Sequence, residues 1–328
     1  GEADEIPFSG MQQAWFGAPR EVLLSPFVYV NISDYLHVED GEVFMVPTRP
    51  EFREALIWAN GLYEEGLIDP LAFTQDEDAF ASVAQNPDGA LIGAYPAGHQ
   101  VMGFNIDNPD RWNQYFAIPP LEGPNGYRMA TWRPASYGEA GFAITDKASE
   151  EVAQVAIEME DWVHTLEGGL SAMWGPRGEI WDWAEAGDLG MRGQPAVFRT
   201  DFAAMEPGVV YGFEPPFYLK MEDFMAWNQT QDIDQETGYE RRLTLATDMY
   251  AEFTPDEVLP GSYWFSEEEA DLYAQYQTDF NSYIDQNVVA FITGQQDIEG
   301  DWDEFQNGLR TLGLDAYVEL VQNAYDQN

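Results

Sequence analysis

The chain contains no cysteine, which excludes disulfide bonds, thiolate nucleophiles and cysteine-ligated zinc sites. Basic residues are also scarce: the 14 lysines and arginines include only two lysines, Lys147 and Lys220, and they stand against 59 acidic residues. The formal net charge of −45 argues against nucleic acids and anionic membrane surfaces as partners, because both need a positive protein face. Such acidity is typical of a secreted protein adapted to salt, which screens the repulsion among its own charges. The alternative is ordinary sequence drift in an exported acidic protein.

Long hydrophobic runs are missing as well. No stretch of 18 apolar residues occurs, so the sequence predicts no membrane-spanning segment. No secretory signal stands at residue 1, although a mature or truncated chain would look the same. The 328 residues are nevertheless 45% hydrophobic and 15% aromatic. This composition excludes a disordered acidic chain and is sufficient for two lobes with a large core.

Sequence signals of catalysis are poor. The chain has no G-x-S-x-G or H-E-x-x-H motif and no glycine-rich phosphate loop. Of its three histidines, His164 is predicted to be a helix residue and His99 a loop residue that could touch a ligand; the third is His37. Carboxylate pairs of the kind a glycosidase needs can be drawn anywhere among 59 acids, so they carry almost no specificity.

Hydrophobic periodicity predicts alternating strands and helices. Residues 28–46 indicate a hairpin that turns at residues 39–41, and a helix is predicted from Pro50 to Gly66. Short strands are predicted at residues 90–95, 115–118 and 141–145. Behind the last of them, an apolar helix face is predicted to end at the glycine pair 168–169; this face comprises Val152, Val155, Ala156, Met159, Val163 and Leu166. This alternation favours an α/β architecture, although residues 170–250 give no clear pattern.

The C-terminal part carries the clearest local signals. Ser266 and Glu269 form a capping box, so a long helix is expected to start there and to end at Gly294. Shorter helices are expected from about residues 301 and 315. Three motifs follow one another in this part: "FITG" at residues 291–294, "WDEF" at 302–305 and "LGLDAY" at 312–317.

In this order, the motifs resemble the C-terminus of the extracellular solute-binding proteins of ABC importers, in the lipoprotein-type branch that captures oligosaccharides. The segments "LYEEGLIDP" (62–70), "IPPLEGPNG" (118–126) and "GFAIT" (141–145) also follow the order of maltose-binding-type proteins. The resemblance implies an α/β, two-lobe periplasmic-binding-protein-like (type II) fold. Roughly the first third of a typical member is absent, so the first lobe is expected to be incomplete. Residues 1–137 and 250–328 would form the C-terminal lobe, and 138–249 the remaining part of the N-terminal lobe.

The resemblance also implies a function. The chain would be the substrate-binding subunit of an ABC transporter, capturing oligosaccharides by lobe closure and delivering them to a membrane permease. It would be extracellular and lipid-anchored at the cell surface, or periplasmic, and monomeric. Two alternatives stay open: an extracellular glycoside hydrolase that uses a carboxylate pair, and a stand-alone surface adhesin.

Aromatic faces stack on sugar rings, and planar charged groups pair with hydroxyls, so we expect the ligand site among such residues near the crossovers between the lobes. The position of each residue relative to the resemblance selects five candidates: Tyr95, Trp132, Arg133, Trp174 and Trp264. For each aromatic residue, the alternative is a side chain packed in the core.

The first residues suggest a metal site by the same resemblance. Many relatives carry a loop of the form D-x-N-x-N-G-x-x-D-E-I-P, which is similar to an EF-hand calcium loop, and this chain begins inside it. Asp4 and Glu5 would then be carboxylate ligands of a structural Ca²⁺, and Glu2 would offer its backbone carbonyl. The first three ligands are missing, and the alternative is an acidic, frayed N-terminus.

Overall fold

The computed structural model describes residues 5–12, 18–104, 108–131, 142–204 and 219–327. The chain divides into two compact units. Unit 1 comprises Gly1–Gly138 and Ala246–Asn328, and unit 2 comprises Glu139–Leu245. The assignment of residues 1–137 and 250–328 to a C-terminal lobe, and of 138–249 to an N-terminal one, remains a prediction. In the described residues, no helix is both long and apolar enough to cross a membrane.

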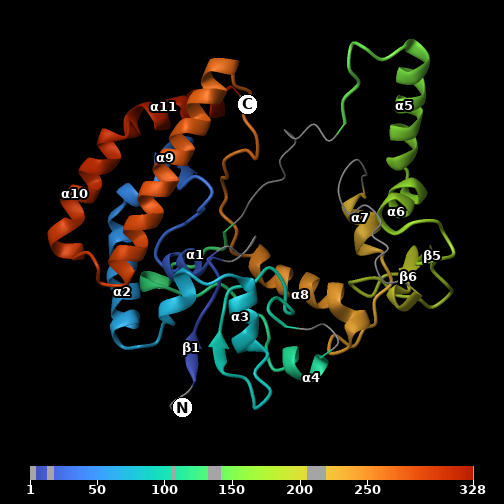
Figure 1. The fold of residues 1–328 in the computed structure, drawn as a ribbon, viewed down its shortest axis with the longest axis horizontal. Helices are drawn as coiled ribbons and strands as arrows, with labels where there is room; N and C mark the ends of the chain where they lie inside the picture. The colour runs from blue at the N-terminus through green and yellow to red at the C-terminus, as the bar shows by residue number, and fades with distance from the viewer. Residues whose placement is uncertain (1–4, 13–17, 105–107, 132–141, 205–218, 328) are drawn as a thin grey trace. The chain divides into compact units, whose positions relative to one another are not determined.

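The main core of unit 1 lies between four helices: α2 (Pro50–Glu64), α9 (Glu267–Ile292), α10 (Ile298–Thr311) and α11 (Leu314–Tyr325). Figure 1 shows them side by side, α2 in blue and the other three in orange to red. On α9 the buried residues Phe280, Ile284, Val288 and Phe291 recur every three or four positions, and they face the buried side of α2. This spacing confirms the apolar faces that the sequence predicts.

The ends of these helices follow local signals. The predicted capping box at α9 is confirmed: the Glu269 amide donates to Ser266 Oγ at 3.3 Å, and the Ser266 amide donates to Glu269 Oε2 at 2.8 Å. Gly294, with φ of 72°, follows the end of α9, as the helix-terminating role of glycine predicts. Helix α10 starts about three residues earlier than expected, because Asp297 caps it by accepting a hydrogen bond from the Glu299 amide.

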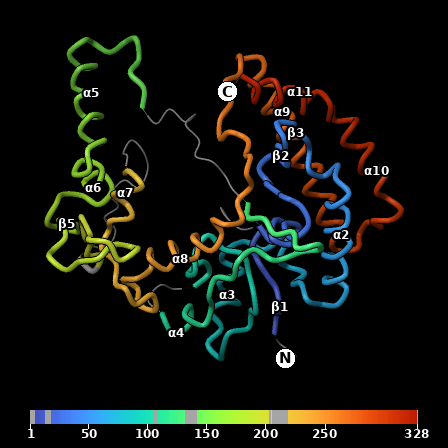
Figure 2. Tube along the Cα trace, turned by 180° about the vertical axis from the view of Figure 1, so that it is seen from behind, coloured from blue at the N-terminus to red at the C-terminus, as the bar shows by residue number. Residues whose placement is uncertain are grey.

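The predicted hairpin is confirmed by β2 (Leu36–Glu39) and β3 (Glu42–Met45), which pair antiparallel. Asp40 and Gly41 form the turn, both with positive φ, as a two-residue hairpin turn requires. Strand β3 packs against α11 (Figure 2), and the turn η1 (Val46–Thr48) leads into α2. The short helix α1 (Pro19–Leu24) also packs on α2.

A second, smaller core of unit 1 contains a parallel pair, β1 (Ile6–Phe8) with β4 (Ile92–Ala94). The connection between these strands includes the turn η2 (Pro70–Phe73) and helix α3 (Glu77–Ala84), and α4 (Pro109–Trp112) follows β4. The predicted strand at 90–95 is thus confirmed, but the one at 115–118 is wrong. Those residues are irregular, since Pro119 and Pro120 cannot donate to a ladder and Tyr115 donates through its hydroxyl to the Ile92 carbonyl (2.7 Å).

Unit 2 has helices α5 (Glu150–Val163), α6 (Leu166–Trp174) and α7 (Met221–Met225), and an antiparallel pair, β5 (Trp181–Trp183) with β6 (Phe198–Thr200). Short turns η4 (Phe202–Ala204) and η5 (Glu236–Gly238) follow, and the boundary with unit 1 falls inside α8 (Tyr239–Ala251). The core is rich in tryptophan; its buried members include Leu170, Trp174, Trp181, Met191, Phe198 and Trp227.

Two expectations about the start of unit 2 are wrong. Residues 142–145 form no strand, and Gly141 lies outside the described residues. Ile144 is exposed, so no described residue covers its side chain. The helix predicted to reach residues 168–169 ends at Val163, because Thr165 caps a new helix by accepting from the Gly168 amide at 3.1 Å. A Cβ at position 168 would collide with the Trp162 carbonyl, which explains the glycine there.

Candidate functional site

Of the predicted ligand-binding residues that the structure describes, Trp264 is the one open to solvent. Its side chain is 90% exposed, on the loop that precedes α9. Its neighbours Tyr263 and Phe265 are partly buried, and both pack against Tyr273 with ring centroids 5.6 and 5.1 Å apart. The loop is therefore anchored on both sides of an exposed indole, an arrangement that suits stacking on a sugar ring.

Tyr95 follows β4 and lies in the smaller core of unit 1. Its ring packs against Phe80, Phe104 and Tyr115 with centroid distances of 5.1, 5.8 and 5.4 Å. The hydroxyl donates to the Gln100 carbonyl at 3.4 Å. These contacts match the packed-aromatic alternative, and the residue is half-buried.

Trp174, at the end of α6, is only 2% exposed. Its ring packs on Trp227 at 4.9 Å and on Phe198 at 5.6 Å, so it belongs to the core of unit 2. The indole N–H is buried without a hydrogen-bond acceptor. A role of Trp174 in ligand binding stays a prediction, which would require the surrounding aromatic side chains to move.

The remaining predicted residues fall mostly outside the described part of the chain. Trp132 and Arg133 lie there, as do Glu2 and Asp4 of the predicted calcium loop. Glu5 is described: it is exposed and directly precedes β1. Among the described residues, no group of three or more histidines or carboxylates is placed to hold a metal ion. The calcium site therefore stays a prediction.

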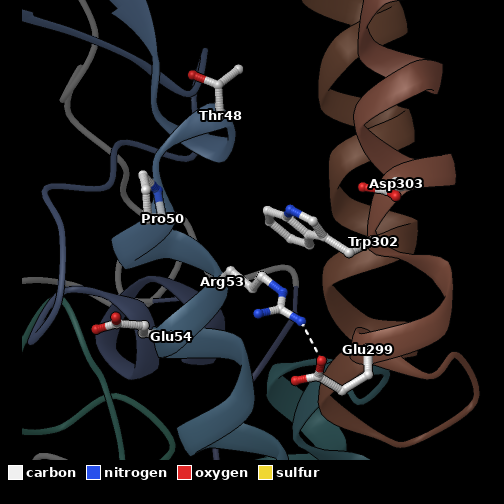
Figure 3. Close-up of a pocket in the computed structure, with 7 residues that line it drawn as sticks. All are labelled: Thr48, Pro50, Arg53, Glu54, Glu299, Trp302 and Asp303. Atoms are coloured by element: carbon white, nitrogen blue, oxygen red, sulfur yellow. Dashed lines mark ion pairs between the residues drawn. The ribbon is translucent and has the colours of Figure 1, made fainter.

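A surface pocket of about 410 Å³ lies between α2 and α10, all within unit 1 (Figure 3). In Figure 3, Trp302 points from α10 toward α2, and the Arg53 guanidinium lies below its ring. Arg53 pairs with Glu299 at 2.8 Å, so its charge is already compensated. Glu54 and Asp303 also line the pocket. The excess of carboxylates argues against an anionic ligand here, and no sequence motif predicted the pocket.

Asp285 of α9 is partly buried and holds two side-chain partners. Arg20 donates to its Oδ2 at 2.8 Å and Tyr35 donates to its Oδ1 at 2.6 Å. Burial raises the pKa of the Tyr35 hydroxyl well above its ordinary value, so it remains a proton donor to the carboxylate. The network ties α1 and the hairpin to α9, and its role is structural.

Phe116 is an exposed aromatic residue that sequence reasoning missed. Phe116 is 79% exposed, whereas the sequence predicts a strand at residues 115–118. In a strand, neighbouring side chains point to opposite faces, so the predicted strand already implied that one of Tyr115 and Phe116 is exposed. In the structure, Tyr115 packs against Tyr95 and Phe116 faces solvent.

The arrangement of elements is that of the type II solute-binding proteins. A human-milk-oligosaccharide (HMO)-binding, ABC-transporter-associated solute-binding protein from Bifidobacterium longum infantis superposes with a TM-score of 0.73. The two are 17% identical, and the match covers 99% of this chain and 65% of that one. The Streptococcus pneumoniae substrate-binding protein FusA, solved with kestose, gives a TM-score of 0.72 at 21% identity, over 100% of this chain and 64% of that one. These likenesses confirm the predicted fold.

At the sequence level the chain is homologous to FusA, the fructooligosaccharide ABC transporter substrate-binding protein of S. pneumoniae serotype 4. The two are 24% identical over 344 aligned positions, which include all of this chain and 58% of FusA. No protein-family model matches the chain. FusA has also been solved as an EF-hand mutant with fructo-nystose (TM-score 0.70, 20% identity). The chain therefore spans about three fifths of the length of its relatives.

Proposed function

We propose that the chain is part of the substrate-binding subunit of an ABC importer, which captures oligosaccharides and delivers them to a membrane permease. The observation that carries this proposal is the homology to FusA along the whole chain. The type II fold supports it, because hinge closure of two lobes is the ordinary way in which such a receptor encloses a ligand. The protein would act without catalysis, as a monomer that is extracellular and lipid-anchored, or periplasmic, and a structural Ca²⁺ would bind at Asp4 and Glu5.

The chemistry of the ligand follows from the surface. Trp264 supplies an exposed aromatic face, and stacking on such a face requires no charge on the sugar. A net charge of −45 repels anionic sugars. We therefore infer a neutral oligosaccharide, and fructooligosaccharides are the first class to test. A glycoside hydrolase is not supported by any particular carboxylate pair.

Isothermal titration calorimetry on the full-length protein tests the proposal, with kestose, nystose, maltotriose, xylotriose and trigalacturonate. We expect saturable binding of at least one neutral sugar, and weaker binding by Trp264→Ala. Chromatography of the same mixtures after prolonged incubation should recover each sugar intact. A folded protein that binds none of the five would refute the proposal, and the release of shorter sugars would show an enzyme instead.

A further inference from the structure

Two segments of unit 1, linked by the hydrogen bond from the Tyr250 hydroxyl to the Ile118 carbonyl, carry a strip of exposed apolar side chains. It consists of Phe116, Ile118 and Leu121 on one segment and of Met249 and Tyr250 on the other. Phe116 is by far the most exposed of the five. We call these five residues the apolar strip. Exposed large apolar groups on neighbouring segments indicate a binding surface.

The strip is held in place by hydrogen bonds on both sides of Phe116. The Tyr115 hydroxyl donates to the Ile92 carbonyl of β4, and the Tyr250 hydroxyl donates to the Ile118 carbonyl, both at 2.7 Å. Further along, the Ala130 amide donates to the Phe253 carbonyl, also at 2.7 Å. The Phe116 ring is therefore presented to solvent from an anchored backbone. An aromatic ring that is ordered before binding loses little entropy when a ligand stacks on it.

Polar groups that suit sugar hydroxyls follow the strip in the chain, since Glu122 comes directly after Leu121. The Arg128 guanidinium lies over the Phe253 ring, 5.1 Å from its centroid, and its Nη2 is 3.2 Å from Glu122 Oε2. Its Nε is buried and has no acceptor. A planar guanidinium next to a carboxylate offers both donors and acceptors to the vicinal hydroxyls of a sugar.

The strip also has a defined place along the chain. One segment leads toward the point where the chain leaves unit 1 after residue 138, and the other begins where it returns at residue 246. A second copy of the protein is a poor occupant of this surface, because two bodies of charge −45 repel each other. A neutral ligand avoids that repulsion.

We propose that Phe116 is a sugar-stacking residue, on which a ring of the oligosaccharide lies while Arg128 and Glu122 bind its hydroxyls. This inference rests on the proposed function and adds a residue that determines affinity. It requires an aromatic face at position 116. A leucine there keeps the apolar character and most of the volume but removes that face.

The test compares Phe116→Leu with Phe116→Tyr by calorimetry, using nystose or whichever neutral sugar of the panel binds the unmodified protein best. Leu71→Ala, a truncation at another exposed apolar residue of unit 1, is the matched control. If stacking contributes as it does between aromatic pairs, Phe116→Leu should raise Kd about tenfold, whereas Phe116→Tyr and Leu71→Ala should stay within about twofold of the unmodified protein. Circular dichroism melting curves should be equal for all four proteins, because both substituted side chains are exposed.

The outcomes separate the two proposals. A protein that binds no sugar in any form overturns the proposed function and this inference with it. Sugar binding with the same Kd in Phe116→Leu as in the unmodified protein overturns this inference alone. A change in molar mass by light scattering in Phe116→Leu, with no change in Kd, would show that the strip is an association surface and would also overturn it.

Discussion

His37 gives the protein a pH-dependent stability whose size can be worked out. The imidazole lies on β2, is 5% exposed, and stacks on Tyr29 with ring centroids 4.2 Å apart. The edge of Phe44 covers its other side at 5.7 Å. Burial, reinforced by the nearby Arg49 and opposed by Glu257, lowers the pKa of His37 to about 4. In the folded protein this ring is therefore neutral at pH 5 and above.

The direction of the effect follows from proton binding. An exposed histidine in the unfolded chain has a pKa of about 6.5, so the unfolded state binds more protons than the folded state between pH 6.5 and 4. The contribution of His37 to stability is thus complete above pH 6.5 and is lost as the pH falls toward 4. From these two pKa values, the loss between pH 7 and pH 5 is about 2 kcal/mol.

Urea unfolding at pH 7 and pH 5 should reveal this loss when the wild-type protein is compared with His37→Phe. The variant keeps a stacked ring that cannot titrate. The 59 acidic residues titrate in both proteins, so the difference between the two pH-dependent losses isolates His37. Because the chain has three histidines, NMR can also follow each imidazole separately. A midpoint near 6.5 for His37, or equal losses in both proteins, would refute the reasoning.

Three further outcomes are expected. Asp285→Asn leaves Arg20 without its counter-charge, and it should lower the free energy of unfolding in urea by about 2–4 kcal/mol. This loss is smaller than for a fully buried ion pair, because Asp285 is partly exposed. An unchanged urea midpoint would contradict the prediction. Raising sodium chloride from low to molar concentration should raise Tm by several degrees, since about 1 kcal/mol shifts Tm by about 2–4 °C in a domain of this size; a flat response would show that the acids do not interact. Hydrogen exchange should be faster in α5 than in α9, and equal protection of the two helices would be evidence against this. In the same way, Val155→Ala should lower the free energy of unfolding by under about 0.5 kcal/mol, because Val155 is exposed, whereas Val288→Ala should lower it by about 1 kcal/mol or more, because Val288 is buried.

The helices that the sequence predicts well are those with signals at both ends. For α9, a capping box, a regular apolar face and Gly294 all lie within the helix or next to it. The hairpin is similar, because its turn residues are adjacent to the strands they join. Such signals act through neighbours in the chain and need no information about the rest of the fold.

Short strands are harder, because a strand exists only through its partner. Residues 90–95 and 115–118 have comparable apolar character. Strand β4 nevertheless pairs with β1, about 85 positions away in the chain, whereas residues 115–118 form no strand with any described residue. The same limit applies to the apolar face of α5. Val152, Val155 and Met159 are exposed, whereas Val163 is buried.

Among the candidate ligand residues, sequence alone could not separate surface from core. Tyr95, Trp174 and Trp264 are all large aromatics in glycine- or proline-rich surroundings or beside a helix end, but their burial depends on distant residues. Phe198 and Trp227 pack against Trp174, whereas Trp264 is 90% exposed. Whether an aromatic side chain can contact a ligand depends on whether distant residues cover it, and that is a property of the tertiary structure.

The extreme acidity and the compact core are compatible because the two are kept apart in space. In the described part of the chain, Glu21 and Asp34 are the acidic residues that are fully buried. Asp34 accepts a hydrogen bond from the Leu36 amide at 3.1 Å, so its carboxylate is compensated locally. The other described carboxylates reach water, where salt at 0.1 M screens the interaction between charges that are more than about 10 Å apart. Repulsion therefore acts between surfaces and leaves packing intact, and for this reason added salt should raise Tm without altering the near-ultraviolet circular dichroism of the tryptophan-rich cores.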